Sequence, residues 1–227
     1  MEELKDKYMK KYGLSPSLMC INIENLKEEL SKLDNTVIDS YHIDIMDANY
    51  VANFALGIGD VWAVQRLSSK PFDIHLMVEN PDCMIDLLNM EHCQTIYVHL
   101  DSCKHPHRTL AKIKGMNKRA GIVLNPGSSV QEVNEYLEII DDVLLMSVNP
   151  GYAGQKFLTS SYDKLDRLKK ILKNANHSIN VMIDGAINKD NISKLAQNGA
   201  NSFVLGTASL FKNDNDYEKN IRELLSE

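Results

Sequence analysis

The chain contains the segment Tyr41-His42-Ile43-Asp44-Ile45-Met46-Asp47, in which polar and apolar residues alternate. Such alternation predicts a β-strand, because successive side chains of a strand point to opposite faces. His42 and Asp44 therefore share one face with Met46, while the two isoleucines share the other. An imidazole and a carboxylate on one face are residue types that bind divalent metal ions.

Two further strand-like runs carry residues of the same chemistry. Residues 71–77 include His75, and residues 179–185 include Asp184. With His42 and Asp44 they make a mixed nitrogen and oxygen set, which suits zinc, iron, manganese or cobalt better than magnesium or calcium. A single His or Asp at a strand end is more often a hydrogen-bonded structural residue. The metal hypothesis therefore depends on whether the fold brings all four together.

The composition is that of an ordinary globular protein, with 44% hydrophobic and 25% charged residues among 227. This length suits one large α/β domain, and no linker or break in composition divides residues 1–227. We expect residues 1–13 to form a charged extension before the first strand.

Charge and hydropathy exclude several classes of function. The net charge is −6 and no basic stripe occurs, which argues against a general nucleic-acid binder. No run approaches the length of a membrane-spanning helix, and the amino terminus has no apolar signal-peptide core. The four cysteines form no C-x-x-C pair and fit reduced thiols. We therefore expect a soluble, cytoplasmic protein without nucleic-acid or membrane partners.

Eight strand-like runs alternate with amphipathic stretches. The predicted strands span residues 14–20, 41–46, 72–77, 95–100, 120–124, 143–148, 180–184 and 202–206. The predicted helices span residues 23–33, 61–67, 81–90, 108–113, 130–139, 162–172, 191–198 and 217–225. Strands that alternate with helices pair in parallel, and eight such units predict a single (β/α)8 TIM barrel. An open doubly wound sheet is the alternative, but no G-x-G-x-x-G motif follows the first strand.

The barrel would gather the four metal-ligand candidates. Functional residues of such barrels lie at the carboxyl ends of the strands. We expect His42 and Asp44 at the end of the second strand, His75 at the end of the third and Asp184 at the end of the seventh. All four would then face one mouth of the barrel.

Small residues follow the last three predicted strands, in the segments 149–155, 184–186 and 206–209. They let backbone N–H groups approach an anion closely, and barrels of this kind often hold a phosphate after strands seven and eight. A single glycine there is more often a turn residue, but three such loops together indicate a small phosphorylated substrate.

A metal ion flanked by Asp44 and Asp184 can act on both faces of one carbon. One carboxylate removes a proton next to a carbonyl, the metal stabilises the enediolate, and the other carboxylate returns a proton from the opposite side. The outcome is inversion of a stereocentre beside a ketone. Met46, Met77 and Met146 are core filler or a dry, polarisable lining for this chemistry, with even weight for each interpretation.

With these residues in view, the chain resembles the ribulose-phosphate 3-epimerase family from about residue 15 to residue 211. The matching motifs are Ser15-Pro16-Ser17-Leu18, His42-Ile43-Asp44-Ile45-Met46-Asp47, Asp73-Ile74-His75-Leu76-Met77, Asn80-Pro81, Met146-Ser147-Val148-Asn149-Pro150-Gly151, Gly154-Gln155-Lys156-Phe157 and Asp184-Gly185.

The resemblance implies a role for each of these sites. It implies one divalent transition metal (Zn, Fe, Mn or Co) held by His42, Asp44, His75 and Asp184, with Asp44 and Asp184 as the acid/base pair. It implies that Ser17 and His75 touch a ketose phosphate, as does Asp184. The implied phosphate and substrate loops consist of Gly151, Tyr152, Ala153, Gly154, Gly185, Ala186, Gly206 and Thr207. We also expect the chain to form a homo-oligomer.

The chain departs from the family pattern in three places, one of which is Pro150-Gly151-Tyr152-Ala153-Gly154 where the family usually has Pro-Gly-Phe-Gly-Gly. The usual Met-Asp-Gly-His-Phe-Val-Pro-Asn is Met46-Asp47-Ala48-Asn49-Tyr50-Val51-Ala52-Asn53 here, and the usual Asp-Gly-Gly is Asp184-Gly185-Ala186. Segments 17–20, 153–155 and 205–211 look more like the allulose-6-phosphate 3-epimerase branch. Both a pentulose and a hexulose phosphate therefore remain as substrates, with a slight preference for the hexulose.

Two other functions compete with an epimerase. A sugar-phosphate decarboxylase of this fold would carry an Asp-x-Lys-x-x-Asp strand, and a Schiff-base aldolase would carry a lysine at a strand end. Neither pattern is present. A catalytically impaired barrel that only binds a phosphosugar is the other alternative, and the altered loop at 48–52 is the reason to consider it.

Overall fold

The computed structural model describes residues 12–212 and 216–226, in which eight strands form one parallel sheet. The strands are β1 (Gly13–Pro16), β2 (Tyr41–Met46), β3 (Phe72–Met77), β4 (Cys93–His99), β5 (Arg119–Leu124), β6 (Asp142–Met146), β7 (Asn180–Asp184) and β8 (Ser202–Leu205). Their order is β1-β8-β7-β6-β5-β4-β3-β2. Each strand from β3 to β8 thus pairs with its predecessor along the chain, as successive βα units require.

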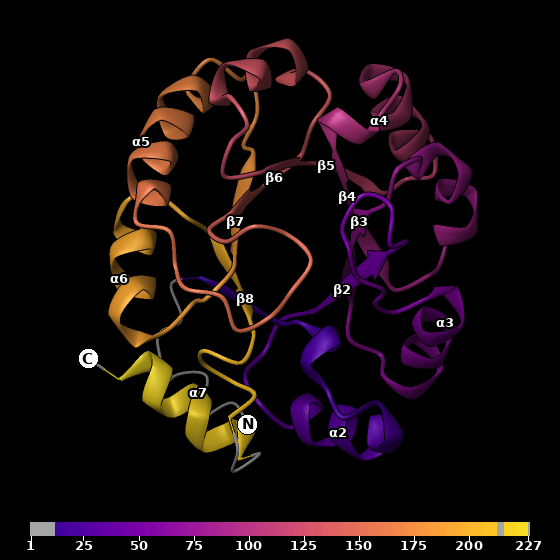
Figure 1. The fold of residues 1–227 in the computed structure, drawn as a ribbon, viewed down its shortest axis with the longest axis vertical. Coiled ribbons are helices and arrows are strands. Elements are labelled where there is room, and N and C mark those ends of the chain that lie inside the picture. Colours follow the sequence, from indigo (N-terminus) through magenta and orange to yellow (C-terminus); the bar gives the residue numbers. More distant parts are fainter. Residues whose placement is uncertain (1–11, 213–215, 227) are drawn as a thin grey trace.

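A ring of helices surrounds the strands (Figure 1). The α-helices are α2 (Leu26–Asp34), α3 (Ile58–Leu67), α4 (Pro106–Gly115), α5 (Ser160–Leu172), α6 (Lys189–Gln197) and α7 (Tyr217–Leu225). Short 3₁₀ segments are η1 (Leu18–Cys20), η2 (Ile23–Asn25), η3 (Pro81–Cys83), η4 (Ile85–Leu88), η5 (Leu100–Ser102) and η6 (Val130–Tyr136). Among the described helices none is long and apolar enough to cross a membrane.

The barrel closes where the two ends of the sheet meet. A parallel bridge between Ser17 and His42 joins the end of β1 to β2, and the backbones of these two strands lie close together. The closed arrangement confirms the predicted (β/α)8 barrel and excludes the open doubly wound sheet.

Two predicted helices are not α-helices. Residues 81–90 form η3 and η4, and residues 130–139 form η6 followed by irregular chain. The β-branched Val130 and Val133 have lower α-helix propensity than straight-chain residues, and short connections of this kind commonly use the tighter 3₁₀ winding. Both segments still cover the sheet, because Ile85, Leu88, Val130 and Val133 are buried.

Only Tyr12 and Gly13 of the predicted amino-terminal extension lie in the described part of the chain. Gly13 already belongs to β1, and the ring of Tyr12 packs edge-on against Phe203 with centroids 5.1 Å apart. Residues 1–11 lie outside the described part of the chain.

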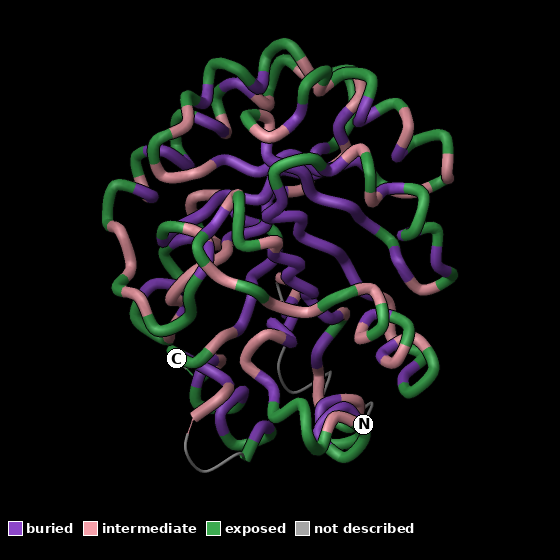
Figure 2. Tube along the Cα trace, turned by 45° about the vertical axis from the view of Figure 1, so that its right-hand side comes forward, coloured by how far each residue is buried: buried purple, intermediate pink, exposed green. Residues whose placement is uncertain are grey.

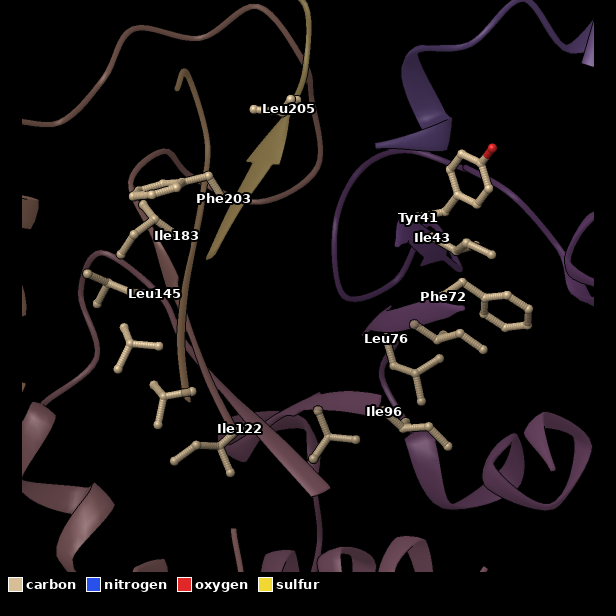
Figure 3. Packing of buried hydrophobic residues seen from close by; sticks show 14 of the residues in the cluster. Tyr41, Ile43, Phe72, Leu76, Ile96, Ile122, Leu145, Ile183, Phe203 and Leu205 are labelled. Atoms are coloured by element: carbon tan, nitrogen blue, oxygen red, sulfur yellow. The ribbon is translucent and has the colours of Figure 1, made fainter. Parts of the chain in front are cut away.

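Apolar side chains between the strands and the helices form the main core. Figure 3 shows Ile43, Phe72, Ile96 and Leu145 pointing away from the barrel axis, and Figure 2 shows the strands buried beneath exposed outer loops and helices. Because side chains alternate along a strand, burial of this outer face holds the other face toward the barrel interior. On β2 that inner face carries His42 and Asp44.

Candidate metal centre and substrate cavity

The barrel interior brings together the four predicted metal ligands. One ligand atom each of His42, Asp44, His75 and Asp184 lies within 4.8 Å of the others. Asp184 ends β7 as expected, but His42, Asp44 and His75 lie within their strands rather than at the ends. The register of β2 with β3 explains their proximity, since it aligns Asp44 with His75.

His42 is fully buried and uses its two ring nitrogens differently. Nδ1 contacts Oδ1 of Asp73 at 2.5 Å, while Nε2 lies 3.3 Å from Asp44 Oδ1 and 3.9 Å from Asp184 Oδ2. Nε2 has no hydrogen-bond partner among the described residues. A buried polar atom without a partner is costly, and one that faces two carboxylates fits a metal ligand.

His75 is oriented in the opposite sense. Its Nδ1 lies 3.1 Å from Asp44 Oδ1 and 3.9 Å from Asp184 Oδ2, and its Nε2 lies 2.8 Å from Nε2 of His99. His99 is fully buried, and burial with the neighbouring His75 holds the pKa of His99 well below its usual range. Burial and the neighbouring His75 therefore disfavour the protonated form of His99.

The pKa values of Asp44 and Asp184 are shifted in opposite directions. Burial by itself raises the pKa of Asp44, but His42 and His75 outweigh it and hold that pKa well below its usual range. Ser17 Oγ also donates a hydrogen bond to Asp44 Oδ2 at 2.7 Å. Burial raises the pKa of Asp184 to about 6 against the opposing effect of His42. One carboxyl group is therefore held ionised and the other is a better proton donor.

A cavity opens above the carboxylates. Its lining includes Asp44 and Asp184 together with Ser17, Met46, Met77, Met146, Gly151, Tyr152, Ala153, Gly154, Gly185, Ala186, Gly206 and Thr207. Every predicted substrate-contact residue except His75 thus lines it. His75 is completely buried beside the carboxylates and is not part of the lining. Gln155, which was quoted as part of a motif but given no site role, also lines the cavity and donates to the backbone oxygens of Asn149 and Tyr152.

Left-handed backbone shapes the loops around the cavity. Gly151 and Gly185 have φ values of +116° and +117°, and a Cβ on Gly185 would lie 2.5 Å from Val148. Ala48 and Ala186 adopt φ values of +59° and +52°. These are two positions where the family pattern has glycine, so the chain keeps the glycine conformation while carrying a methyl group.

The altered loop after β2 forms hydrogen bonds within itself and to two neighbouring segments. Asp47 Oδ1 accepts hydrogen bonds from the backbone N–H groups of Asn49 and Tyr50, both at 2.9 Å, and its Oδ2 accepts one from Glu79 at 2.8 Å. Asn53 donates to the backbone oxygen of Gly151 at 2.7 Å. The loop is therefore tied to the loop after β6 despite the loss of Gly and Pro.

The sequence analysis assigned no function to two residues that lie beside the metal-ligand candidates. Asp73 and His99 were given no role, although Asp73 lies two residues before His75 on β3, and His99 ends β4. The period of two alone places Asp73 on the inner face with His75. The partner of His99 is set by the pairing of β3 with β4, which a single sequence does not specify.

The fold and the cluster define a TIM barrel with a candidate divalent-metal centre and an acidic pair at one cavity. Residues 13–210 match the sequence model of a protein family, and that family is described as the ribulose-phosphate 3 epimerase family. The chain belongs to this family. A ribulose-phosphate 3-epimerase from Helicobacter pylori is 38% identical over 194 residues, covering 86% of this chain and 88% of its own length.

Two further relatives and one solved structure are also similar to this chain. The ribulose-phosphate 3-epimerase of Bacillus subtilis is 34% identical, covering 88% of this chain and 93% of its own, and that of Escherichia coli is 32% identical, covering 96% and 97%. Among solved structures, a mutant tryptophan synthase α-subunit from Pyrococcus furiosus superposes with a TM-score of 0.70 at 16% identity, covering 95% of this chain and 98% of that one. This last likeness concerns the fold alone.

Proposed function

We propose that the chain inverts the C3 stereocentre of a ketose phosphate, with ribulose 5-phosphate and xylulose 5-phosphate as its substrate pair. The observation that carries this proposal is the pair Asp44 and Asp184, which line one cavity with pKa values displaced in opposite directions. Epimerisation needs a base on one face of the carbon and an acid on the other, and such a pair supplies both.

The carboxylates perform the proton transfers. Asp44 is held ionised and removes the C3 proton, and Asp184 delivers a proton to the opposite face of the planar intermediate. In the reverse direction the two residues exchange roles, as microscopic reversibility requires. The hydrogen bond from Ser17 keeps Asp44 Oδ2 in a fixed position.

The donor set fits a divalent metal ion that His42, Asp44, His75 and Asp184 would hold. When bound, the ion stabilises negative charge that develops on the substrate oxygens during proton removal. Zinc, iron, manganese and cobalt all suit two imidazoles and two carboxylates.

The other lining residues bind and shield the substrate. Backbone N–H groups of the loops at Gly151–Gly154, Gly185–Ala186 and Gly206–Thr207 would hold the phosphate, in keeping with the close backbone approach that small residues allow. Met46, Met77 and Met146 give the cavity a non-basic wall that keeps water from the reacting carbon.

The names of the relatives favour a pentulose. Those of Helicobacter, Bacillus and Escherichia are all named ribulose-phosphate 3-epimerases, and this outweighs the short segments that resemble the hexulose branch. Ala186 also adds a methyl group to the phosphate side of the cavity. Comparing kcat/KM for ribulose 5-phosphate and allulose 6-phosphate tests this. A preference above about tenfold for the pentulose is expected, and one of that size for the hexulose would reverse the assignment.

We further propose that the protein works in the cytoplasm as a homo-oligomer. The four cysteines are unpaired thiols, as in a reducing compartment. Phe54 and Trp62 are exposed by 74% and 42% and are candidates for a subunit contact. Light scattering coupled to gel filtration would show more than one chain per particle, whereas a monomer at micromolar concentration would contradict it.

A further inference from the structure

The two ligand imidazoles are held by different partners outside the metal centre. His42 turns Nε2 toward the carboxylates and Nδ1 toward Asp73. His75 turns Nδ1 toward the carboxylates and Nε2 toward His99. Each imidazole can offer a metal only the nitrogen that carries no proton, so these outer partners decide which nitrogen is free.

Asp73 decides the tautomer of His42. An ionised carboxylate only accepts hydrogen bonds, so the contact of 2.5 Å places the proton of His42 on Nδ1. Nε2, which has no hydrogen-bond partner among the described residues, is then the nitrogen left to bind a metal ion. A histidine ligand whose second nitrogen donates to a carboxylate is a common arrangement at metal sites.

His99 decides the tautomer of His75 by accepting a hydrogen bond. Two ring nitrogens 2.8 Å apart need one proton between them. If His75 is to present the Nδ1 lone pair, its Nε2–H must donate to His99 Nε2, and the proton of His99 must lie on Nδ1. Two neighbouring rings hold the ring of His99 in place. Its centroid lies 5.0 Å from that of His75, on which it stacks, and 4.6 Å from that of Tyr50.

We propose that Asp73 and His99 are positioning residues that hold His42 and His75 in opposite tautomers, so that a divalent ion is bound by Nε2 of His42 and Nδ1 of His75. The inference rests on the proposed metal-dependent function. Asp73 on β3 acts through a carboxylate oxygen, and His99 on β4 acts through a ring nitrogen.

Zinc affinity, measured by competition with a chromophoric chelator, tests the two positions. Asp73→Leu and His99→Leu fill the space but accept no hydrogen bond, and each should weaken affinity about 10- to 100-fold. Asp73→Asn and His99→Gln keep an acceptor oxygen and should recover most of that loss. Asp142→Asn is the matched control, because this buried carboxylate pairs with Arg119 and contacts neither histidine. Its zinc affinity should equal that of the wild type.

Histidine ¹⁵N NMR of the zinc-loaded wild-type protein gives the decisive readout and needs no variant to fold. We expect protonated Nδ1 on His42 and protonated Nε2 on His75. A zinc-loaded protein with His75 unprotonated at Nε2, or leucine variants that bind zinc as tightly as the wild type, would overturn the inference. If the wild type took up no zinc, iron, manganese or cobalt, the proposed metal-dependent function itself would fail.

Discussion

Ser17 and His42 form the backbone bridge that joins β1 to β2. The same serine donates its hydroxyl to Asp44, so the residue that closes the barrel also fixes one of the two acidic groups. Closure and assembly of the site are therefore linked, because Asp44 receives the hydrogen bond from Ser17 only when the two end strands meet.

Removal of that hydroxyl should weaken catalysis. Ser17→Ala takes away a hydrogen bond to a charged group, which is typically worth about 1.5–3 kcal/mol. We expect kcat/KM to fall about 10- to 100-fold. Metal content, measured by elemental analysis, should stay at the wild-type level because Ser17 is not a ligand. An unchanged kcat/KM would show that the hydroxyl does not support Asp44.

Glycine should stabilise the protein at positions 48 and 186. Ala48 and Ala186 have left-handed backbones, which cost an L-residue about 1–2 kcal/mol. Part of the gain is lost because glycine increases the entropy of the unfolded chain. We therefore expect Ala48→Gly or Ala186→Gly to raise the free energy of unfolding by about 0.5–1 kcal/mol. Denaturant unfolding measures it. Ala153→Gly is the control, since Ala153 is not among the residues with positive φ, and a similar gain there would contradict the explanation.

Loss of either acidic residue should abolish epimerisation. Asp44→Asn and Asp184→Asn each remove one partner in proton transfer, which typically costs about 10²- to 10⁴-fold, and each also removes a candidate ligand atom. Turnover of ribulose 5-phosphate measures the effect. If either variant kept more than roughly a tenth of wild-type activity, the acid/base assignment would be wrong.

The raised pKa of Asp184 predicts how the metal-free protein responds to pH. Burial raises the folded-state pKa from its ordinary value of 3.8 to about 6. A carboxyl group with a raised folded pKa contributes its full stability below pH 3.8 and loses it as the pH rises through 6. Asp184→Asn should therefore become increasingly more stable than the metal-free wild type between pH 4 and 7. Thermal unfolding after chelation measures the difference, and a gap that shrinks as the pH rises would contradict the shift.

The metal centre should be occupied when the protein is purified without chelator. Elemental analysis is expected to find near-stoichiometric zinc, iron, manganese or cobalt. His42→Ala and His75→Ala should lower that occupancy, because each removes one ligand nitrogen from the cluster. Purified wild-type protein with no bound metal and full activity would refute the assignment.

Alternation along the strands is the reason that much of the fold could be predicted. β2, β3 and β7 have the predicted bounds, because their runs are short, apolar on the outer face and followed by turn residues. The segment from residue 130 was misassigned as an α-helix because hydrophobic spacing does not separate an α-helix from 3₁₀ turns in a short connection. Periodicity gives the face of a residue but not its depth, so His42 was expected at a strand end and lies near the start of β2.

The four metal-ligand candidates could be predicted because residue type and strand face are both local properties. Their outer partners depend on register. His75 reaches His99 only because β3 pairs with β4 so that Leu76 aligns with Val98, and no local pattern specifies that alignment. The strain at Ala48 was equally hidden, because the sequence shows a missing glycine but not whether the backbone keeps the conformation of one.

Exchange at C3 of ribulose 5-phosphate in D₂O tests the central claim most directly. The metal-free protein, the same protein reloaded with zinc or cobalt, and the loaded Asp184→Asn variant would be compared by NMR. We predict deuterium at C3 of both epimers with the reloaded wild type only. Equal exchange by the metal-free protein, or epimerisation without deuterium at C3, would contradict the metal-assisted mechanism in which Asp44 and Asp184 transfer the protons.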